Sequence, residues 1–333
     1  MAYYALECVD DAVEATRDFL LPVDRSRWLK LAVVVFFLSG GSGVSSLPNT
    51  SWNVSAEELG VVDVPPGLDS LPELFDTVLP FLVGLAVVFA LVGVVFALVG
   101  SIMEFVLVDS LRTGSVAVRA TMREYLGGGL ALFAFRLVLG LVVVGLFAAL
   151  ALVLVVPAIG NDAQLLFGVA VLVPVGLVVG VTAAVVHGLT TEFVVPTMIH
   201  EDRGLRSAWG RFWPVLRGNL GQFALYVLVR FALTIGVGIV AGIAVGIAAV
   251  VVGVPFVVLG GVAWFGTGGA LTLGSAVVYG LLLAVYVLTL LAVTAVVQVP
   301  LKSFTRYYEL LVLGDVEPEL DLIPERRESV RSP

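Results

Sequence analysis

Six stretches of mostly apolar residues dominate this chain of 333 residues. A helix needs about 20 apolar residues to cross the hydrocarbon core of a bilayer, and each stretch reaches that length. A water-soluble domain is excluded, because 59% of the residues are hydrophobic and only 13% are charged, too few to cover a soluble core. We therefore predict six membrane-spanning helices over residues 28–47, 79–103, 129–156, 165–191, 223–252 and 274–299.

The positions of Lys and Arg predict the orientation of these spans. All 18 basic residues lie in four segments that alternate with segments containing none. Basic residues favour the cytoplasmic side of a membrane. We therefore predict a multi-pass protein of the cell membrane with both termini in the cytoplasm. The four basic segments are 1–30, 112–136, 203–230 and 302–331.

Two segments on the predicted outer side raise separate questions. The fifth apolar stretch continues past Pro255 for a length that would suffice for a second crossing. A seventh span would place the basic tail outside, so we predict that residues 254–265 are interfacial or re-entrant. The outer segment 48–78 holds sequons at Asn49 and Asn53, and the sequence leaves their glycosylation open.

Weak self-similarity predicts an internal repeat. The tripeptide Glu-Phe-Val at 104–106 recurs at 192–194, each time at the inner end of an even-numbered span. In both copies an Arg, Arg136 or Arg230, lies ten residues after a Leu within the next span. We therefore expect three parallel repeats, each consisting of a surface helix followed by a membrane hairpin. A fourth surface helix is expected after the last span, with Leu301, Phe304, Tyr308 and Leu311 on its apolar face.

The predicted surface helices are amphipathic. The first has an acidic polar face that anionic lipid headgroups would repel, so its apolar face suits a protein contact, although a solvated interfacial helix without a partner fits equally well. That apolar face consists of Leu6, Val9, Val13, Thr16 and Leu20. The whole is predicted to be an all-α polytopic membrane helix bundle with one domain, residues 1–315, and a disordered cytoplasmic tail, 316–333.

Four ionisable residues are predicted to lie within the membrane, where charges are costly and are therefore candidate functional groups. Glu104 and Glu192 sit near the inner ends of two spans, and Arg136 and Arg230 occur at comparable depth in the spans that follow. We expect ion pairs between Glu104 and Arg136 and between Glu192 and Arg230. The alternative is that both Arg side chains extend to the headgroups and both Glu side chains meet water.

Small residues recur every four positions in three spans, which places them on one helical face where helices can approach closely. Packing within one chain is favoured over a homodimer contact. The three sets are Gly176, Gly180, Ala184 and Gly188; Gly238, Gly242 and Gly246; and Ala276, Gly280 and Ala284.

The sequence contains no recognisable catalytic, cofactor-binding or metal-binding constellation. The two histidines, His187 and His200, are thirteen positions apart without Cys or clustered carboxylates, which makes a poor metal site. The run 127–129 of three glycines opens a membrane helix, so it suits a hinge or a tight approach rather than a phosphate cradle. No segment combines dense basic charge with aromatic residues, so nucleic-acid binding is not expected.

The chain resembles a haloarchaeal family of uncharacterised six-span membrane proteins. The resemblance covers nearly the whole chain and rests on DAVEATR at 11–17, WLKLA at 28–32, VP at 299–300 and RYY at 306–308. It is more distantly similar to the membrane domain attached to some glycerophosphoryl diester phosphodiesterases. The hydrolytic barrel of those proteins has no counterpart here, so the resemblance implies a topology and no activity.

These observations favour a non-enzymatic integral membrane protein that scaffolds or regulates a partner at the cytoplasmic face. The expected contacts are membrane lipid and a protein partner bound through the surface helices; the oligomeric state stays open. The alternative is a transporter or channel for a small solute or lipid, against which the sequence shows no clear inverted repeat and no broken helix with convergent polar groups at the midplane. A membrane enzyme acting on lipid is a third possibility, against which the sequence shows no paired acid and base groups.

Overall fold

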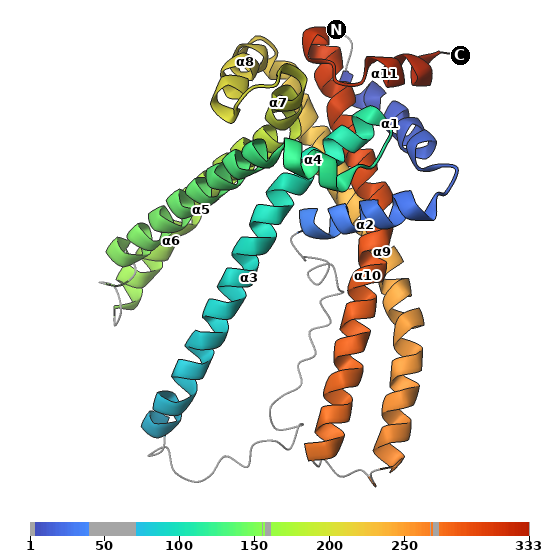
Figure 1. Cartoon of the computed structure of the whole chain (residues 1–333). Coiled ribbons are helices and arrows are strands. Elements are labelled where there is room, and N and C mark those ends of the chain that lie inside the picture. Colours follow the sequence, from blue (N-terminus) through green and yellow to red (C-terminus); the bar gives the residue numbers. More distant parts are fainter. Residues whose placement is uncertain are drawn as a thin grey trace.

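The computed structural model describes residues 4–39, 71–154, 156, 161–266, 268 and 273–332. Within these residues every regular element is a helix. Short helices gather at one end of the molecule and long helices extend from them (Figure 1). Both termini lie at the end formed by the short helices.

Five helical stretches are long and apolar enough to cross a membrane. Each of the last five expected spans falls on one of them. The helices α5 and α6 descend from the common end as one hairpin, α9 and α10 form a second, and α3 diverges between them (Figure 1). Their bounds are α3 (Leu71–Thr113), α5 (Leu126–Leu154), α6 (Asp162–Leu189), α9 (Leu220–Gly266) and α10 (Leu273–Val316).

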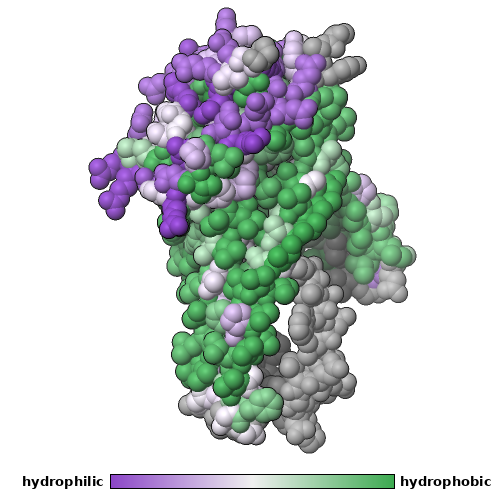
Figure 2. Space-filling model, turned by 90° about the vertical axis from the view of Figure 1, so that its right-hand side faces the viewer, coloured by the Kyte–Doolittle hydropathy of each residue, from purple (hydrophilic) through white to green (hydrophobic). Residues whose placement is uncertain are grey.

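The remaining helices form what we call the polar end. Hydrophilic residues gather there, whereas the surface of the long helices is hydrophobic (Figure 2). The buried core of the described chain also lies towards this end, around Phe105, Phe193 and Tyr308. The short helices are α1 (Tyr4–Leu20), α2 (Arg25–Leu38), α4 (Val118–Glu124), η4 (Thr190–Val194), α7 (Val195–Glu201), α8 (Leu205–Gly218), η5 (Pro318–Leu320) and α11 (Pro324–Arg331).

The first expected span, 28–47, differs from the structure. The helix there, α2, has 14 residues and ends at Leu38, whereas a crossing needs about 20. It lies across the upper parts of α3 and α10 (Figure 1). The close approach to α3 depends on Gly100, where a β-carbon would lie 2.7 Å from the carbonyl oxygen of Phe37. Residues 40–47, like the sequons at Asn49 and Asn53, fall outside the described residues.

The structure shows no separate re-entrant segment at residues 254–265, and the interfacial placement of these residues stays a prediction. These residues continue α9, a single helix of 47 residues that contains Pro255. A proline removes one backbone donor, and packing against a neighbouring helix compensates for this. The ring of Phe256 meets that of Tyr286 on α10 at 5.5 Å, and the Tyr286 hydroxyl donates to the carbonyl of Ala249 at 3.4 Å.

Two expected surface helices are continuous with spans. Residues 301–311 belong to α10, which runs unbroken through Pro300. The surface segment after the second span is mostly part of α3, and α4 has only seven residues. The three parallel repeats therefore stay a prediction.

The packing of α1 also differs in part from the expected amphipathic face. Thr16 and Leu20 are buried as expected, but Leu6 and Val13 are 56% and 54% exposed. The buried stripe is formed instead by small and aromatic residues at spacings of three and four, which let α1 lie close against α10. This stripe consists of Cys8, Ala12, Ala15 and Phe19.

The expected disordered tail is a folded element in the structure. Leu320, Leu322 and Ile323 are buried, which draws the segment after α10 back onto the polar end. Charge then fixes α11 there: Arg331 lies 2.7 Å from carboxylate oxygens of both Asp11 and Asp315. The sequence did not predict this fold of the tail, because charged residues surround its short apolar cluster.

The small-residue stripes pack in only one of the three helices. On α6, a β-carbon at Gly176 would lie 2.5 Å from the Phe147 ring of α5. At Gly238, Gly242, Gly246 and Gly280 a β-carbon would meet nothing within 4 Å. The expectation that these residues pack against helices of the same chain is therefore wrong for α9 and for Gly280.

Docking of α11 can be tested through Cys8, the only cysteine. Its thiol donates to Asp315 at 3.1 Å, and burial together with this hydrogen bond raises the pKa of Cys8 above its ordinary value. A neutral, buried thiol reacts slowly with alkylating agents. We expect Arg331→Glu to raise the rate of Cys8 alkylation in folded protein about fivefold to tenfold, because it removes two ion pairs worth about 1 kcal/mol together.

The matched control is Arg17→Glu, a charge reversal on an exposed position of α1. It should leave the alkylation rate unchanged. Equal rates for Arg331→Glu and the unmodified protein would show that α11 does not hold Cys8 covered.

Candidate functional site: a buried charge network at the polar end

A continuous network of charged side chains lies where the long helices meet the polar end. All five apolar stretches contribute to it, because η4, which continues α6, supplies Glu192. Three arginines alternate with three glutamates, so the network is neutral overall. The order of contacts is Arg136, Glu104, Arg306, Glu309, Arg230 and Glu192.

Glu104 on α3 is the link between two hairpins. One of its carboxylate oxygens lies 3.1 Å from Nη2 of Arg136 on α5, and the other contacts Arg306 on α10. Arg136 also donates to Ser101 at 3.3 Å and to the Thr191 hydroxyl at 3.1 Å. The Glu104 side chain is only 8% exposed, so its charge depends on these donors for neutralisation.

Glu192 forms the second expected contact. Its Oε1 lies 3.2 Å from Nε of Arg230 on α9, and its Oε2 accepts a hydrogen bond of 2.6 Å from the Tyr226 hydroxyl. The Tyr226 ring stacks on Tyr308 at 5.7 Å and meets Phe193 edge-on at 4.9 Å. The structure thus brings together both pairs of residues expected from the sequence, although each is part of a larger network.

The centre of the network was not anticipated from the sequence. Arg306 and Glu309, both on α10, lie 2.6 Å apart through Nη1 and Oε2, and Glu309 also reaches Arg230 at 3.0 Å. Glu309 is 1% exposed. The available signal was an opposite-charge pair three residues apart, and hence on one helical face, inside the mostly apolar stretch 304–313.

Two local features position the Glu side chains. A β-carbon at Gly129 would lie 2.9 Å from the Cα of Ile102, so glycine lets α5 approach α3 beside Glu104. Around Glu192 the chain forms a π-helical turn in which the Val195 amide donates to the Thr190 carbonyl. Pro196 follows and lacks the amide that an α-helix would direct to the Glu192 carbonyl, which favours the wider turn.

The chemistry of the network is that of a structural clamp. Each of the three carboxylates already contacts two donor side chains, and arginine does not release its proton under ordinary conditions. A relay of protons along the network would therefore be interrupted at every guanidinium. A neutral set of charges that pair across five helices instead favours one relative position of the helices that carry them.

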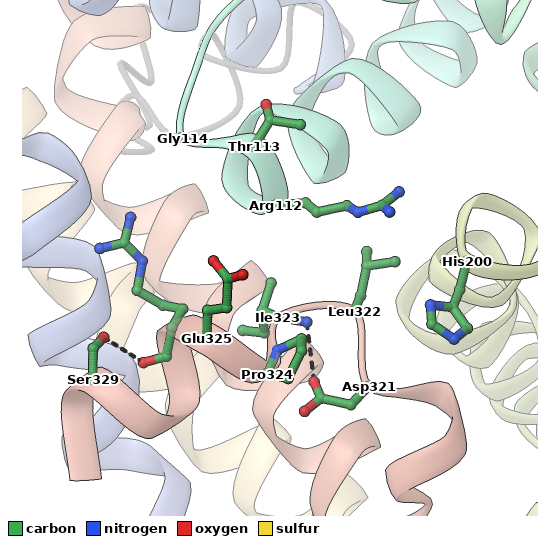
Figure 3. Close-up of a pocket in the computed structure, with 11 residues that line it drawn as sticks. Arg112, Thr113, Gly114, His200, Asp321, Leu322, Ile323, Pro324, Glu325 and Ser329 are labelled. Carbon is green, nitrogen blue, oxygen red and sulfur yellow. Dashed lines mark hydrogen bonds between the residues drawn. The ribbon is translucent and has the colours of Figure 1, made fainter. Parts of the chain in front are cut away.

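The histidines lie in different places. His187 occupies the last turn of α6, and His200 on α7 lines a cavity of about 560 Å³ together with Arg112 and Glu325 (Figure 3). Opposite charges share this cavity, since Asp321 also lines it and caps the Ile323 amide at 3.0 Å. Among the described residues, no three His, Cys, Asp or Glu side chains gather as metal ligands.

Neutralising Glu104 should destabilise the fold strongly, because Arg306 and Arg136 would each lose a carboxylate in a site largely shielded from water. We expect Glu104→Gln to lower the free energy of unfolding by about 3 kcal/mol, measured by detergent titration of the purified protein. Glu124→Gln, on an exposed site of α4, is the matched control and should stay within about 0.5 kcal/mol of the parent. If Glu104→Gln lowered the free energy of unfolding no more than the control does, the stabilising role of the network would be contradicted.

The link between Glu192 and Arg230 can be isolated with a cycle of neutral substitutions. Reversing two charges would not suffice, because Arg230 also contacts Glu309. We expect Glu192→Gln and Arg230→Met to be non-additive by about 1 to 3 kcal/mol in the free energy of unfolding.

The same cycle run between Glu192→Gln and Arg17→Gln, which share no partner, should be additive within about 0.5 kcal/mol. Additive losses for Glu192 and Arg230 would show that the contact contributes nothing to stability.

Comparison with known proteins gives one family match. No curated protein and no solved structure matches the chain. One family model, described as a family of unknown function, matches residues 3–323 and therefore nearly the whole chain. The chain thus belongs to the DUF7544 family of unknown function.

Proposed function

We propose that this protein is a non-enzymatic membrane scaffold whose polar end faces the cytoplasm and holds a partner protein. The long helices anchor the chain in the cell membrane, and the charge network keeps the polar end in one fixed arrangement. The network is neutral, and no acid and base pair is visible among the described residues. Both observations support a structural role over catalysis.

The observation that carries this proposal is where the charges lie along the long helices. Every Asp, Glu, Lys and Arg of the described spans lies at the polar end or at a helix terminus. Residues 79–103, 137–154, 231–266 and 274–301 contain none. Several hydroxyls there bond to a carbonyl of their own helix, as Thr289 does to Val285. The spans thus offer no charged path for a solute, which argues against a transporter or channel.

A partner contact is supported by apolar side chains that stay uncovered in an otherwise hydrophilic region. Leu6 and Val13 lie seven residues apart on α1, and thus on one face, and both are more than half exposed. Asp10 lies between them on the same face, four residues after Leu6 and three before Val13, and is also exposed. A protein surface is therefore a better match than anionic lipid.

Six crossings with both termini inside are part of the proposal. The N-terminal helix α1 and the start of α3 lie at opposite ends of the molecule (Figure 1). An even number of crossings agrees with the alternation of basic segments, which favours both termini on the cytoplasmic side. The resemblance to haloarchaeal membrane proteins and to the membrane domain of certain phosphodiesterases fits this topology.

Photo-crosslinking in native membranes tests the scaffold role. A photoreactive amino acid at Val13 should give one discrete crosslinked protein, identifiable by mass spectrometry. The same amino acid at Val153, an exposed residue near the far end of α5, is the control and should give lipid adducts only. Purified protein in liposomes should not raise the flux of protons or small ions above that of empty vesicles.

Two results would contradict the proposal. The first is an absence of any protein crosslink specific to Val13. The second is solute flux that appears with the intact protein and disappears with Glu309→Gln, because that would assign the network to transport.

A further inference from the structure

A second cavity, of about 550 Å³, opens between α2 and the segment that joins α3 to α4. Its walls are mostly aliphatic, with Val33 from α2, Val116 from the joining segment and Val118 from the start of α4. Two cationic side chains, Lys30 and Arg119, complete it, and no carboxylate lines it. This charge balance differs from that of the larger cavity, where acidic and basic groups occur together.

The two cations have no counter-charge among the residues that the structure describes. Neither Lys30 nor Arg119 forms an ion pair with another residue of the described chain, and both side chains are exposed. The Lys30 ammonium donates to the backbone carbonyl of Val116 at 3.4 Å, which holds it beside the joining segment. Two uncompensated positive charges beside one cavity favour an anionic ligand.

The surroundings of the cavity indicate which kind of anion. Leu29 and Val33 flank Lys30 along α2 and are 64% and 50% exposed. The cavity therefore lies where apolar surface continues directly into a cationic one, as at the boundary between acyl chains and headgroups. A phospholipid matches both parts of this surface, because its hydrocarbon chains suit the apolar part and its phosphate suits the cationic part.

We propose that this cavity binds the phosphate headgroup of an anionic phospholipid, with Lys30 and Arg119 as its cationic ligands and Val33 and Val118 against its hydrocarbon. The site is separate from the charge network and does not depend on the scaffold role. It would fix α2, and with it the N-terminal helix, at the level of the headgroups.

Lipid binding can be measured on the full chain purified in a neutral detergent. Phosphatidylglycerol is titrated and the bound lipid counted by native mass spectrometry, with phosphatidylcholine as the uncharged comparison. We expect retention of one phosphatidylglycerol in preference to phosphatidylcholine. The double variant Lys30→Gln with Arg119→Gln should weaken phosphatidylglycerol binding about 25-fold, since each cation near a headgroup contributes a factor of about five.

The matched control removes the same amount of charge elsewhere, through Arg17→Gln with Arg206→Gln, both exposed. It should leave lipid binding unchanged, and millimolar inorganic phosphate should not displace the lipid. Equal weakening in both double variants would overturn the proposal, because it would reflect net charge only. Displacement by inorganic phosphate would overturn it as well, by assigning the site to a free anion.

Discussion

Charges that lie inside an apolar environment must be neutralised where they stand, because no water is present to solvate them. In this chain the charges that must be neutralised belong to three glutamates and three arginines at the junction between the long helices and the polar end. Each needs a partner on another helix, so satisfying them joins all five apolar stretches at one level. Glu309, almost fully buried, joins Arg230 on α9 to Arg306 on α10, and Arg306 in turn contacts Glu104 on α3.

The rest of the architecture follows from the position of that junction. Below it the helices carry charges only at their far ends, and the hairpins diverge towards those ends (Figure 1). Gly238, Gly242 and Gly246 on α9 face no neighbouring helix among the described residues. Above the junction, ion pairs and small apolar clusters hold α1 and α11 against α10. The protein is thus ordered around one level, with lipid on one side and polar surface on the other.

The sequence predicted the apolar helices and the two flanking ion contacts, because both depend on simple patterns: long apolar stretches and opposite charges at comparable depth. It missed Arg306 and Glu309, because Pro300 and an amphipathic pattern suggested that a surface helix was separate from the last span. The π-turn at Glu192 depends on a missing amide at Pro196 and leaves no periodic signal. For residues 254–265, the helix continues through Pro255, where Phe256 packs against Tyr286 of α10.

Distances between spin labels test the central claim, that the charge network holds the hairpins in place. Labels at Leu130 on α5 and Leu228 on α9, both exposed, would report the separation of the two hairpins in a Cys8→Ala background. The account predicts one narrow distance distribution for the parent protein in a bilayer and a clearly broadened one for Glu309→Gln. A distribution that stays narrow and unshifted after Glu309 is neutralised would contradict it.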